Sequence, residues 1–278
     1  MIEAALSKFE QFYSDEENQL AGDFHETGYI IRPADDSAAL DHIREFMAGI
    51  VAKHLDVELP EDIGQFLEDI HLKVPVEKVN DLRLSTYRAM NKETWFRPTY
   101  FRLGRSFLQN LVGNELAMQN RINLSIQMPD DQTSLLDIHA DVFSGETPFQ
   151  VVQWTPFVDV KGTQSMFFLP MEKSKKIVSE IKDHAKNGMS GLFDVVKDDL
   201  IWLDVPYGNV VIFSPNCLHG NILNSEQKSR WTFNCRFTGL FTPYTSPEKN
   251  LGSFYLPITP RPVTKIGMSY RAPEGFEE

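Results

Sequence analysis

Two histidines and an aspartate have the types and spacing of a metal site. His139 and Asp141 lie in the stretch RINLSIQMPDDQTSLLDIHADVFSGE (121–146), and His219 follows later in the chain. In an extended segment residues i and i+2 share a face, so the imidazole of His139 and the carboxylate of Asp141 can point at a common centre. An imidazole from a distant strand would complete the two-histidine, one-carboxylate set that holds Fe(II) and leaves positions open for oxygen chemistry. His219 is the candidate for that imidazole.

The surroundings of His219 strengthen a signal that is weak by itself, because His-x-Asp is common and an isolated histidine is more often structural than ligating. An apolar stretch, 210–213, leads through a turn to His219-Gly220, and Arg230 follows eleven residues after His219. This spacing is expected of the next antiparallel strand. A guanidinium there can bind a carboxylate through two hydrogen bonds. The residues together favour a metal site beside an anion site.

Two segments alternate cleanly between polar and apolar residues. Segment 230–237 places Arg230, Thr232, Asn234 and Arg236 opposite Trp231, Phe233, Cys235 and Phe237, and segment 121–128 alternates in the same way. Antiparallel strands with a polar face in solvent would explain the pattern. Alternatively, the aromatic face lies beneath covering helices and the polar face lines a barrel that holds a polar ligand. The closeness of Arg230 to His219 favours the second interpretation, in which Arg236 binds substrate or forms a salt bridge at the barrel end.

The order His-x-Asp, then His-Gly, then an arginine eleven residues on resembles the Fe(II)- and 2-oxoglutarate-dependent oxygenases. The run HGN…N.S…R, which ends at Arg230, is similar to the phytanoyl-CoA dioxygenase-like branch of that superfamily. HADVFSGETPFQVVQWTPFVDV and TQSMFFLP further resemble oxygenases of bacterial carbohydrate and streptomycin-type biosynthetic clusters. The resemblance covers about residues 121–237, and the two ends of the chain fit only loosely.

This resemblance implies a mainly β chain with a helical buttress, whose core is a double-stranded β-helix of the jelly-roll or cupin-like kind. His139, Asp141 and His219 would bind Fe(II) and carry catalysis. Arg230 would pair with the distal carboxylate of 2-oxoglutarate. The other cosubstrate candidates are Asn221, where relatives place a hydroxyl residue, Asn123 and Gln127 on the polar strand before the motif, and Trp154 as a wall of the cavity.

The implied reaction uses O2 and converts 2-oxoglutarate to succinate and CO2 while a substrate C–H bond is hydroxylated. Intact Asp141 favours hydroxylation over halogenation. The resemblance suggests a small polar substrate such as a sugar or sugar conjugate, made or modified in carbohydrate biosynthesis. Desaturation, epimerisation or cyclisation with the same cofactors is an alternative, and so is a metal-binding jelly-roll scaffold without turnover. Arg230 argues against a scaffold, which needs no cosubstrate anchor.

The elements that must position these residues fall into a helical and a strand-rich part of one domain, 1–278. Helical spacing predicts a buttress over 1–115, alternating runs predict the core over 116–242, and the Pro-, Ser- and Thr-rich tail, 243–278, is expected to wrap a surface or close over a site without regular structure. The predicted helices are 3–14, 38–54, 61–72, 76–91, 99–112 and 172–187, and the predicted strands are 28–33, 121–128, 149–157, 165–170, 209–213 and 230–237.

Composition narrows the class of protein. The chain has 278 residues, of which 42% are hydrophobic and 24% charged, as in ordinary globular proteins. A net charge of -12 argues against nucleic-acid or anionic-membrane partners, because phosphate binding relies on clustered Lys and Arg. Two cysteines make no disulfide framework, and no signal peptide or membrane-spanning run is expected. We therefore expect a cytoplasmic enzyme with a small-molecule partner, and a homodimer is compatible with this.

Overall fold

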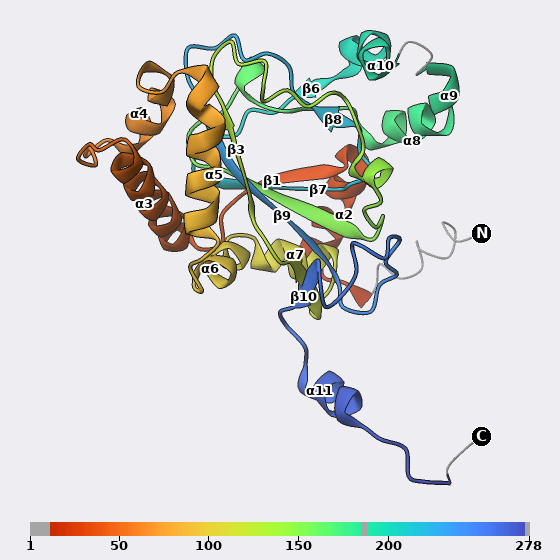
Figure 1. Ribbon diagram of the computed structural model, residues 1–278. Coiled ribbons are helices and arrows are strands. Elements are labelled where there is room, and N and C mark those ends of the chain that lie inside the picture. Colours follow the sequence, from red (N-terminus) through yellow and green to blue (C-terminus); the bar gives the residue numbers. More distant parts are fainter. Residues whose placement is uncertain (1–11, 185–187, 276–278) are drawn as a thin grey trace.

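Two antiparallel sheets face each other across the body of the protein, and helices pack against the larger one (Figure 1). The computed structural model describes residues 12–184 and 188–275. The large sheet has the order β1-β7-β4-β9-β2-β10, with β3 also paired to β9, and the small sheet has the order β6-β5-β8. The protein is thus a mixed α/β structure built on antiparallel sheets.

The strands are short except for β9. They are β1 Tyr29–Pro33, β2 Leu116–Gln119, β3 Asn123–Gln127, β4 Gln150–Pro156, β5 Phe167–Phe168, β6 Ile201–Trp202, β7 Asn209–Phe213, β8 His219–Gly220, β9 Arg230–Gly239 and β10 Tyr255–Pro257. Strand β9 pairs with β4 on one side, and with β3 and then β2 on the other. It is therefore the strand on which the large sheet is assembled.

Most of the described helices precede β2, and three of those described lie between β5 and β6. The α-helices are α2 Asp15–Thr27, α3 Ser37–His54, α4 Ile63–Glu68, α5 Val79–Met90, α6 Phe96–Arg102, α7 Arg105–Leu111, α8 Met171–Ser179, α9 Ile181–His184, α10 Gly188–Val196 and α11 Pro262–Ser269. Short 3-10 turns are η2 Ile70–Leu72, η3 Val76–Lys78, η4 Asp141–Ser144, η5 Gly162–Gln164 and η7 Lys197–Asp199. None of the described helices combines the length and apolar character that crossing a membrane requires.

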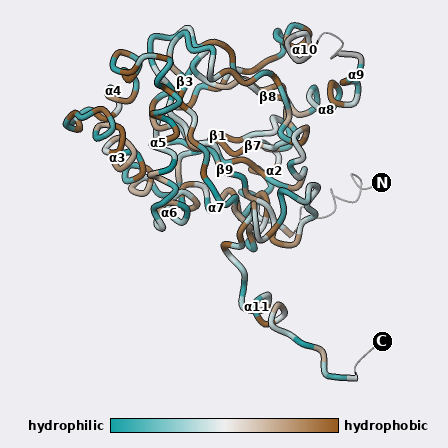
Figure 2. Tube along the Cα trace, in the orientation of Figure 1, coloured by the Kyte–Doolittle hydropathy of each residue, from teal (hydrophilic) through white to brown (hydrophobic). Residues whose placement is uncertain are grey.

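Both faces of β9 are buried, for different reasons. Phe233 contacts the rings of Phe96 and Tyr100 on α6, and the Trp231 indole donates to the carbonyl of Leu67 on α4 at 2.8 Å. Figure 2 shows α3 and α5 in both hydrophobic and hydrophilic colours, as helices with one buried face must be. On the opposite face the side chains of Arg230, Thr232 and Thr238 are also buried. The interpretation with helices over the aromatic face is therefore confirmed, and the solvent-facing one is wrong.

Most predicted elements are present, with shifted or divided bounds. Segment 209–213 is a strand as predicted, 99–112 is divided into α6 and α7, and 172–187 is divided into α8 and α9, with 185–187 outside the described residues. The helix predicted at 3–14 also falls outside them, apart from 12–14. Strands β2, β6, β8 and β10 were not predicted, because each has only two to four residues and shows no alternation.

The expectation of an irregular tail is wrong. Residues 255–257 form β10, which pairs with β2 at the edge of the large sheet. Residues 262–269 form α11, which begins at a proline, a residue suited to the first turn of a helix, and lies apart from the sheets (Figure 1). The strand forms because β2 offers an unpaired edge, and that edge is a property of the tertiary structure.

The buried Tyr100 hydroxyl joins α6 to the large sheet. It lies 3.0 Å from the Gln153 carbonyl and 2.9 Å from the Phe233 carbonyl, and it accepts from Thr155 Oγ1 at 3.2 Å. The change Tyr100→Phe removes these bonds and is expected to lower the free energy of unfolding by about 1–3 kcal/mol, measured by urea denaturation. Tyr270→Phe, at a position 65% exposed, is the control and should change it by less than about 0.5 kcal/mol. Equal stability of the two variants would contradict this role of the hydroxyl.

Candidate metal and cosubstrate site

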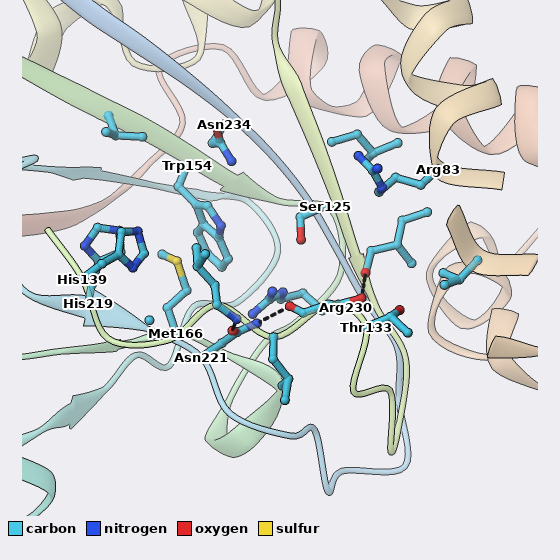
Figure 3. A pocket seen from close by; sticks show the side chains of 18 of the residues that line it. Arg83, Ser125, Thr133, His139, Trp154, Met166, His219, Asn221, Arg230 and Asn234 are labelled. Carbon is cyan, nitrogen blue, oxygen red and sulfur yellow. Dashed lines mark hydrogen bonds between the residues drawn. The ribbon is translucent and has the colours of Figure 1, made fainter. Parts of the chain in front are cut away.

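A cavity of about 640 Å³ lies between the two sheets. The larger sheet contributes residues of β3, β4, β7 and β9 to its walls, and the smaller sheet contributes His219 and Gly220 of β8. Figure 3 shows the rings of His139 and His219 at one end, Arg83 of α5 at the other, and Arg230 between them. The residues singled out for metal and anion binding thus share one cavity.

The two histidines are brought together by the backbone. His139 and His219 pair as an antiparallel bridge, in which each amide donates to the other residue's carbonyl at 2.9 Å. Gly220 allows this approach, because a Cβ at this position would lie 2.7 Å from the Leu136 carbonyl oxygen and 2.8 Å from the Phe167 ring. Glycine after His219 is therefore required by packing. The ring centroids of His139 and His219 lie 4.4 Å apart.

Both imidazoles are held in the same tautomer. Nδ1 of His139 lies 2.7 Å from the Asp137 carbonyl, and Nδ1 of His219 lies 2.9 Å from the Cys217 carbonyl. A carbonyl can only accept, so each Nδ1 carries the proton and donates it. In the neutral rings this leaves the lone pair on Nε2, which is the usual arrangement of metal-ligating histidines.

The three candidate ligand atoms converge. Oδ1 of Asp141 lies 3.5 Å from Nε2 of His139 and 3.9 Å from Nε2 of His219. Within the described part of the chain, these residues form the group whose ligand atoms, all within 4.8 Å of one another, could hold a metal ion. Asp141 opens the 3-10 turn η4, Asp141–Ser144, which directs its carboxylate at the histidines. Two nitrogens and one oxygen suit a first-row divalent metal.

The other carboxylate oxygen of Asp141, Oδ2, forms a salt bridge with Arg236. Nη2 of Arg236 lies 2.8 Å from Oδ2. Burial acts to raise the pKa of Asp141, but contact with His139 and the charges of Arg236 and His219 outweigh burial and hold this pKa well below its usual range. Arg236 forms a salt bridge to a candidate metal ligand and also lines the cavity, so its contact with a substrate stays a prediction.

His219 is enclosed by aromatic rings. Phe168 stacks on it with 5.3 Å between centroids, and Phe213 meets it edge-on at 4.9 Å. Burial lowers the pKa of His219 to about 4, despite the nearby carboxylate of Asp141. At neutral pH the ring is therefore uncharged and able to bind a cation through Nε2.

Arg230 is a buried cation with no acidic partner in the part of the chain that the structure describes. Its Nη1 donates to the carbonyls of Gln164 at 3.1 Å and Ser165 at 3.2 Å, while Nε has no hydrogen-bond partner among the described residues. Burial lowers the pKa of the guanidinium to about 10, so it stays charged at neutral pH. No acidic side chain of residues 12–184 or 188–275 forms an ion pair with it. Such a group strongly favours an anionic ligand.

The remaining predicted site residues divide into two groups. Trp154 and Asn221 line the cavity, and the amide of Asn221 accepts from Leu136 N at 2.6 Å and donates to the Ser134 carbonyl at 3.1 Å, so it holds the loop before His139. Asn123 bonds Asn234 and Gln127 bonds the Ile222 carbonyl, and neither lies among the described residues that line the cavity. Their assignment to the cosubstrate stays a prediction.

Several residues of the cavity wall were not singled out in the sequence. Ser125 and Asn234 lie on the polar faces of β3 and β9, so the alternating pattern that selected their neighbours could have found them. Met166 and Arg83 carry no local signal. They reach the cavity because the segment before β5 and helix α5 are folded against it.

Comparisons with known proteins identify solved structures of similar fold. No family model and no curated protein matches the chain. HygX from Streptomyces hygroscopicus, crystallised with nickel, 2-oxoglutarate and hygromycin B, is 14% identical over 84% of this chain and 90% of that chain, with a TM-score of 0.50. Apo HygX is 14% identical over 83% and 89%, also with a TM-score of 0.50. The nickel complex of ThoJ, a non-heme monooxygenase, is 15% identical over 92% and 89%, with a TM-score of 0.48.

At this level of identity the likeness to HygX shows a shared fold. HygX itself was crystallised with 2-oxoglutarate. Nothing in these likenesses singles out the phytanoyl-CoA dioxygenase-like branch.

Removal of one imidazole tests the metal site. His219→Ala is expected to abolish stoichiometric binding of Co(II), measured by isothermal titration calorimetry, because a site of three protein ligands loses a third of its donors. His25→Ala, at an exposed position of α2, should bind Co(II) as the unchanged protein does. Stoichiometric binding that survives in His219→Ala would remove His219 from the ligand set.

Proposed function

We propose that this protein is an Fe(II)- and 2-oxoglutarate-dependent oxygenase that hydroxylates a C–H bond of a small polar molecule. One observation carries the proposal: the buried Arg230, which pairs with no acidic residue in the described chain, lines the same cavity as His139, Asp141 and His219. A metal-binding scaffold needs only the three ligands. A buried cation beside them is useful when a carboxylate binds there.

The triad suits a ferrous ion in its donors and in their protonation. Two imidazole nitrogens and one carboxylate oxygen form the facial set that leaves other coordination positions open. The Nδ1 protons of His139 and His219 are donated to carbonyls, which leaves Nε2 of each ring facing the metal position, and Asp141 is ionised. Bound Fe(II) would activate O2, which is the oxidant, so that 2-oxoglutarate is converted to succinate and CO2 while the substrate is hydroxylated.

The surroundings of Arg230 suit the distal carboxylate of 2-oxoglutarate. Nε of Arg230 is buried and has no hydrogen-bond partner among the described residues, and the residue lines the cavity. A carboxylate on Arg230 would accept bonds from a guanidinium that is otherwise only partly satisfied. In this proposal Arg230 anchors the cosubstrate, and Asn221 acts through the loop that it holds.

Apolar side chains wall the cavity beside the triad. Trp154, Met166 and Phe213 line it, and each is at least nine-tenths buried. They limit the water that reaches the histidines, and in a site of low dielectric the charges of Arg230 and Asp141 act more strongly. Their surfaces also fix where a substrate can lie relative to Nε2 of the two imidazoles.

The size and lining of the cavity support a second, polar molecule. A volume of about 640 Å³ lies within the range of sites that bind drug-sized ligands and exceeds the needs of a five-carbon acid. Ser125, Thr133, Asn234 and Arg83 supply polar groups to its walls. HygX, which shares the fold, was crystallised with hygromycin B. We therefore propose a hydroxyl-bearing substrate such as a sugar or sugar conjugate.

The architecture proposed for the whole chain follows the same interpretation. The two facing antiparallel sheets are the halves of a double-stranded β-helix, and 1–278 is a single oxygenase domain. Helices α3 to α6 act as a buttress on the outer face of the large sheet, as the contacts of Phe96, Tyr100 and Leu67 with β9 suggest.

Loss of the guanidinium tests the cosubstrate anchor. Arg230→Met is expected to raise the 2-oxoglutarate concentration for half-maximal succinate formation by at least about 30-fold, because truncating one partner of a buried charge pair costs roughly 2–5 kcal/mol. Co(II) affinity should stay unchanged. Arg105→Met, at an exposed position of α7, is the matched control. An unaltered 2-oxoglutarate requirement in Arg230→Met would move the anchor to another residue.

Turnover of the cosubstrate separates an oxygenase from a scaffold. The unchanged protein, with Fe(II), ascorbate, O2 and 2-oxoglutarate, is expected to form succinate, and anaerobic addition of Fe(II) with 2-oxoglutarate should produce a visible absorption band. A scaffold would give neither signal. The band is the decisive measurement where succinate formation waits for a substrate.

A further inference from the structure

Segment 243–255 is hydrogen-bonded to the loop that connects the candidate metal ligand Asp141 to β4. We call this segment the C-terminal clasp. Its hydrogen bonds to the loop are Thr147 Oγ1 to the Pro243 carbonyl at 2.7 Å, Thr245 Oγ1 to the Gly145 carbonyl at 2.9 Å, and Lys249 Nζ to the Ser144 carbonyl at 2.8 Å. Ser144 is the last residue of η4, the turn that begins at Asp141. The clasp therefore holds the end of the turn that presents Asp141.

Glu146 is the buried residue that side chains of the C-terminal clasp contact. Its side chain is only 2% exposed, and its Oε1 lies 2.8 Å from Nζ of Lys249. Its Oε2 accepts from the Tyr255 hydroxyl at 2.9 Å and from Gln150 Nε2 at 3.2 Å. A buried carboxylate is stable only with such partners, and two of these three come from the clasp.

Arg236 lies between Glu146 and Asp141. Its Nη2 lies 2.8 Å from Oδ2 of Asp141, and its Nε lies 3.4 Å from Oε1 of Glu146. The planar guanidinium thus contacts both carboxylates, through a hydrogen bond to Asp141 and a longer ion pair to Glu146, and fixing one contact limits the other. With Lys249 added, two carboxylates and two cations balance in a region that is largely buried.

This arrangement leaves one oxygen of Asp141 for the histidines. Oδ2 is occupied by Arg236, and Oδ1 faces Nε2 of both imidazoles. Without Lys249, the carboxylates of Asp141 and Glu146 would share Arg236 as their cationic partner. Arg236 would then be drawn from Asp141 toward Glu146, and the orientation of the Asp141 carboxylate would be less restricted.

We propose that the C-terminal clasp is a positioning device for Asp141, which acts from Lys249 through Glu146 and Arg236. Metal affinity then depends on a lysine that touches no candidate ligand. This inference rests on the proposed metal site, and it assigns a function to the part of the chain that follows β9. Partners that orient the ligands of a metal typically change its affinity by 10- to 100-fold when they are removed.

The test is Co(II) binding to the metal-free full-length protein by calorimetry, with the visible spectrum of the bound ion recorded in parallel. Lys249→Met is expected to raise the dissociation constant for Co(II) by about 10- to 100-fold and to alter the spectrum. Lys249→Arg keeps the charge and should restore the dissociation constant to within about threefold of the original. Lys265→Met, at an exposed position of α11 in the same tail, is the control and should bind as the unchanged protein does.

A role in stability alone would lower the melting temperature of Lys249→Met and leave its Co(II) affinity and spectrum unchanged, and this result would overturn the proposal. Tyr255→Phe serves where Lys249→Met does not fold, because it removes only a hydroxyl, which lies between Oε2 of Glu146 and Oε1 of Gln150, and it should weaken Co(II) binding by several-fold. Co(II) affinity unaltered in Tyr255→Phe would then count against the clasp. Failure of the unchanged protein to bind Co(II) would reject the metal site itself, and the clasp with it.

Discussion

Strand β9 has to be buried on both faces, and the rest of the structure follows from that constraint. Its aromatic face meets α4 and α6, which supplies the apolar contacts that stabilise the large sheet. Its polar face carries Arg230, Thr232 and Arg236 into the interior between the sheets, where unsatisfied charges are costly. Arg236 forms ion pairs with two carboxylates of the protein, Asp141 and Glu146. Arg230 forms no such bridge within residues 12–184 and 188–275, so the strand that completes the core also carries a buried charge without a carboxylate partner there.

Hydrogen bonds to backbone groups fix the positions and ring orientations of the two histidines of the triad. Hydrogen bonds between His139 and His219 fix the separation of the two residues, and carbonyls two residues before each histidine fix the ring tautomers. The site therefore has little to reorganise when a cation binds, which is the property expected of a preorganised centre. Gly220 makes the approach possible, and its role shows that a residue without a side chain can be as necessary to such a centre as a ligand.

A series of ion pairs connects the candidate metal ligand Asp141 to residues outside the candidate metal site. Asp141 is paired with Arg236, Arg236 with Glu146, and Glu146 with Lys249, so the order of charges runs from the cavity to the C-terminal clasp. Each buried charge is tolerable because the next one compensates it. Segments distant in sequence thereby become parts of one electrostatic unit, and these polar contacts bind the tail to the core together with the apolar cluster around Tyr255.

The sequence by itself determined the local features: the strand at 209–213, the alternation of β9, and the pairing of His139 with Asp141 on one face, because each depends on residues that are close in the chain. It also pointed to His219 and Arg230 through their spacing. The tertiary structure alone decided that Asn123 and Gln127 lie outside the cavity wall, that Arg236 reaches Asp141, and that the tail forms β10 and grips Glu146. These outcomes depend on which strand edges and buried charges meet, and such long-range encounters leave no periodic pattern in the sequence.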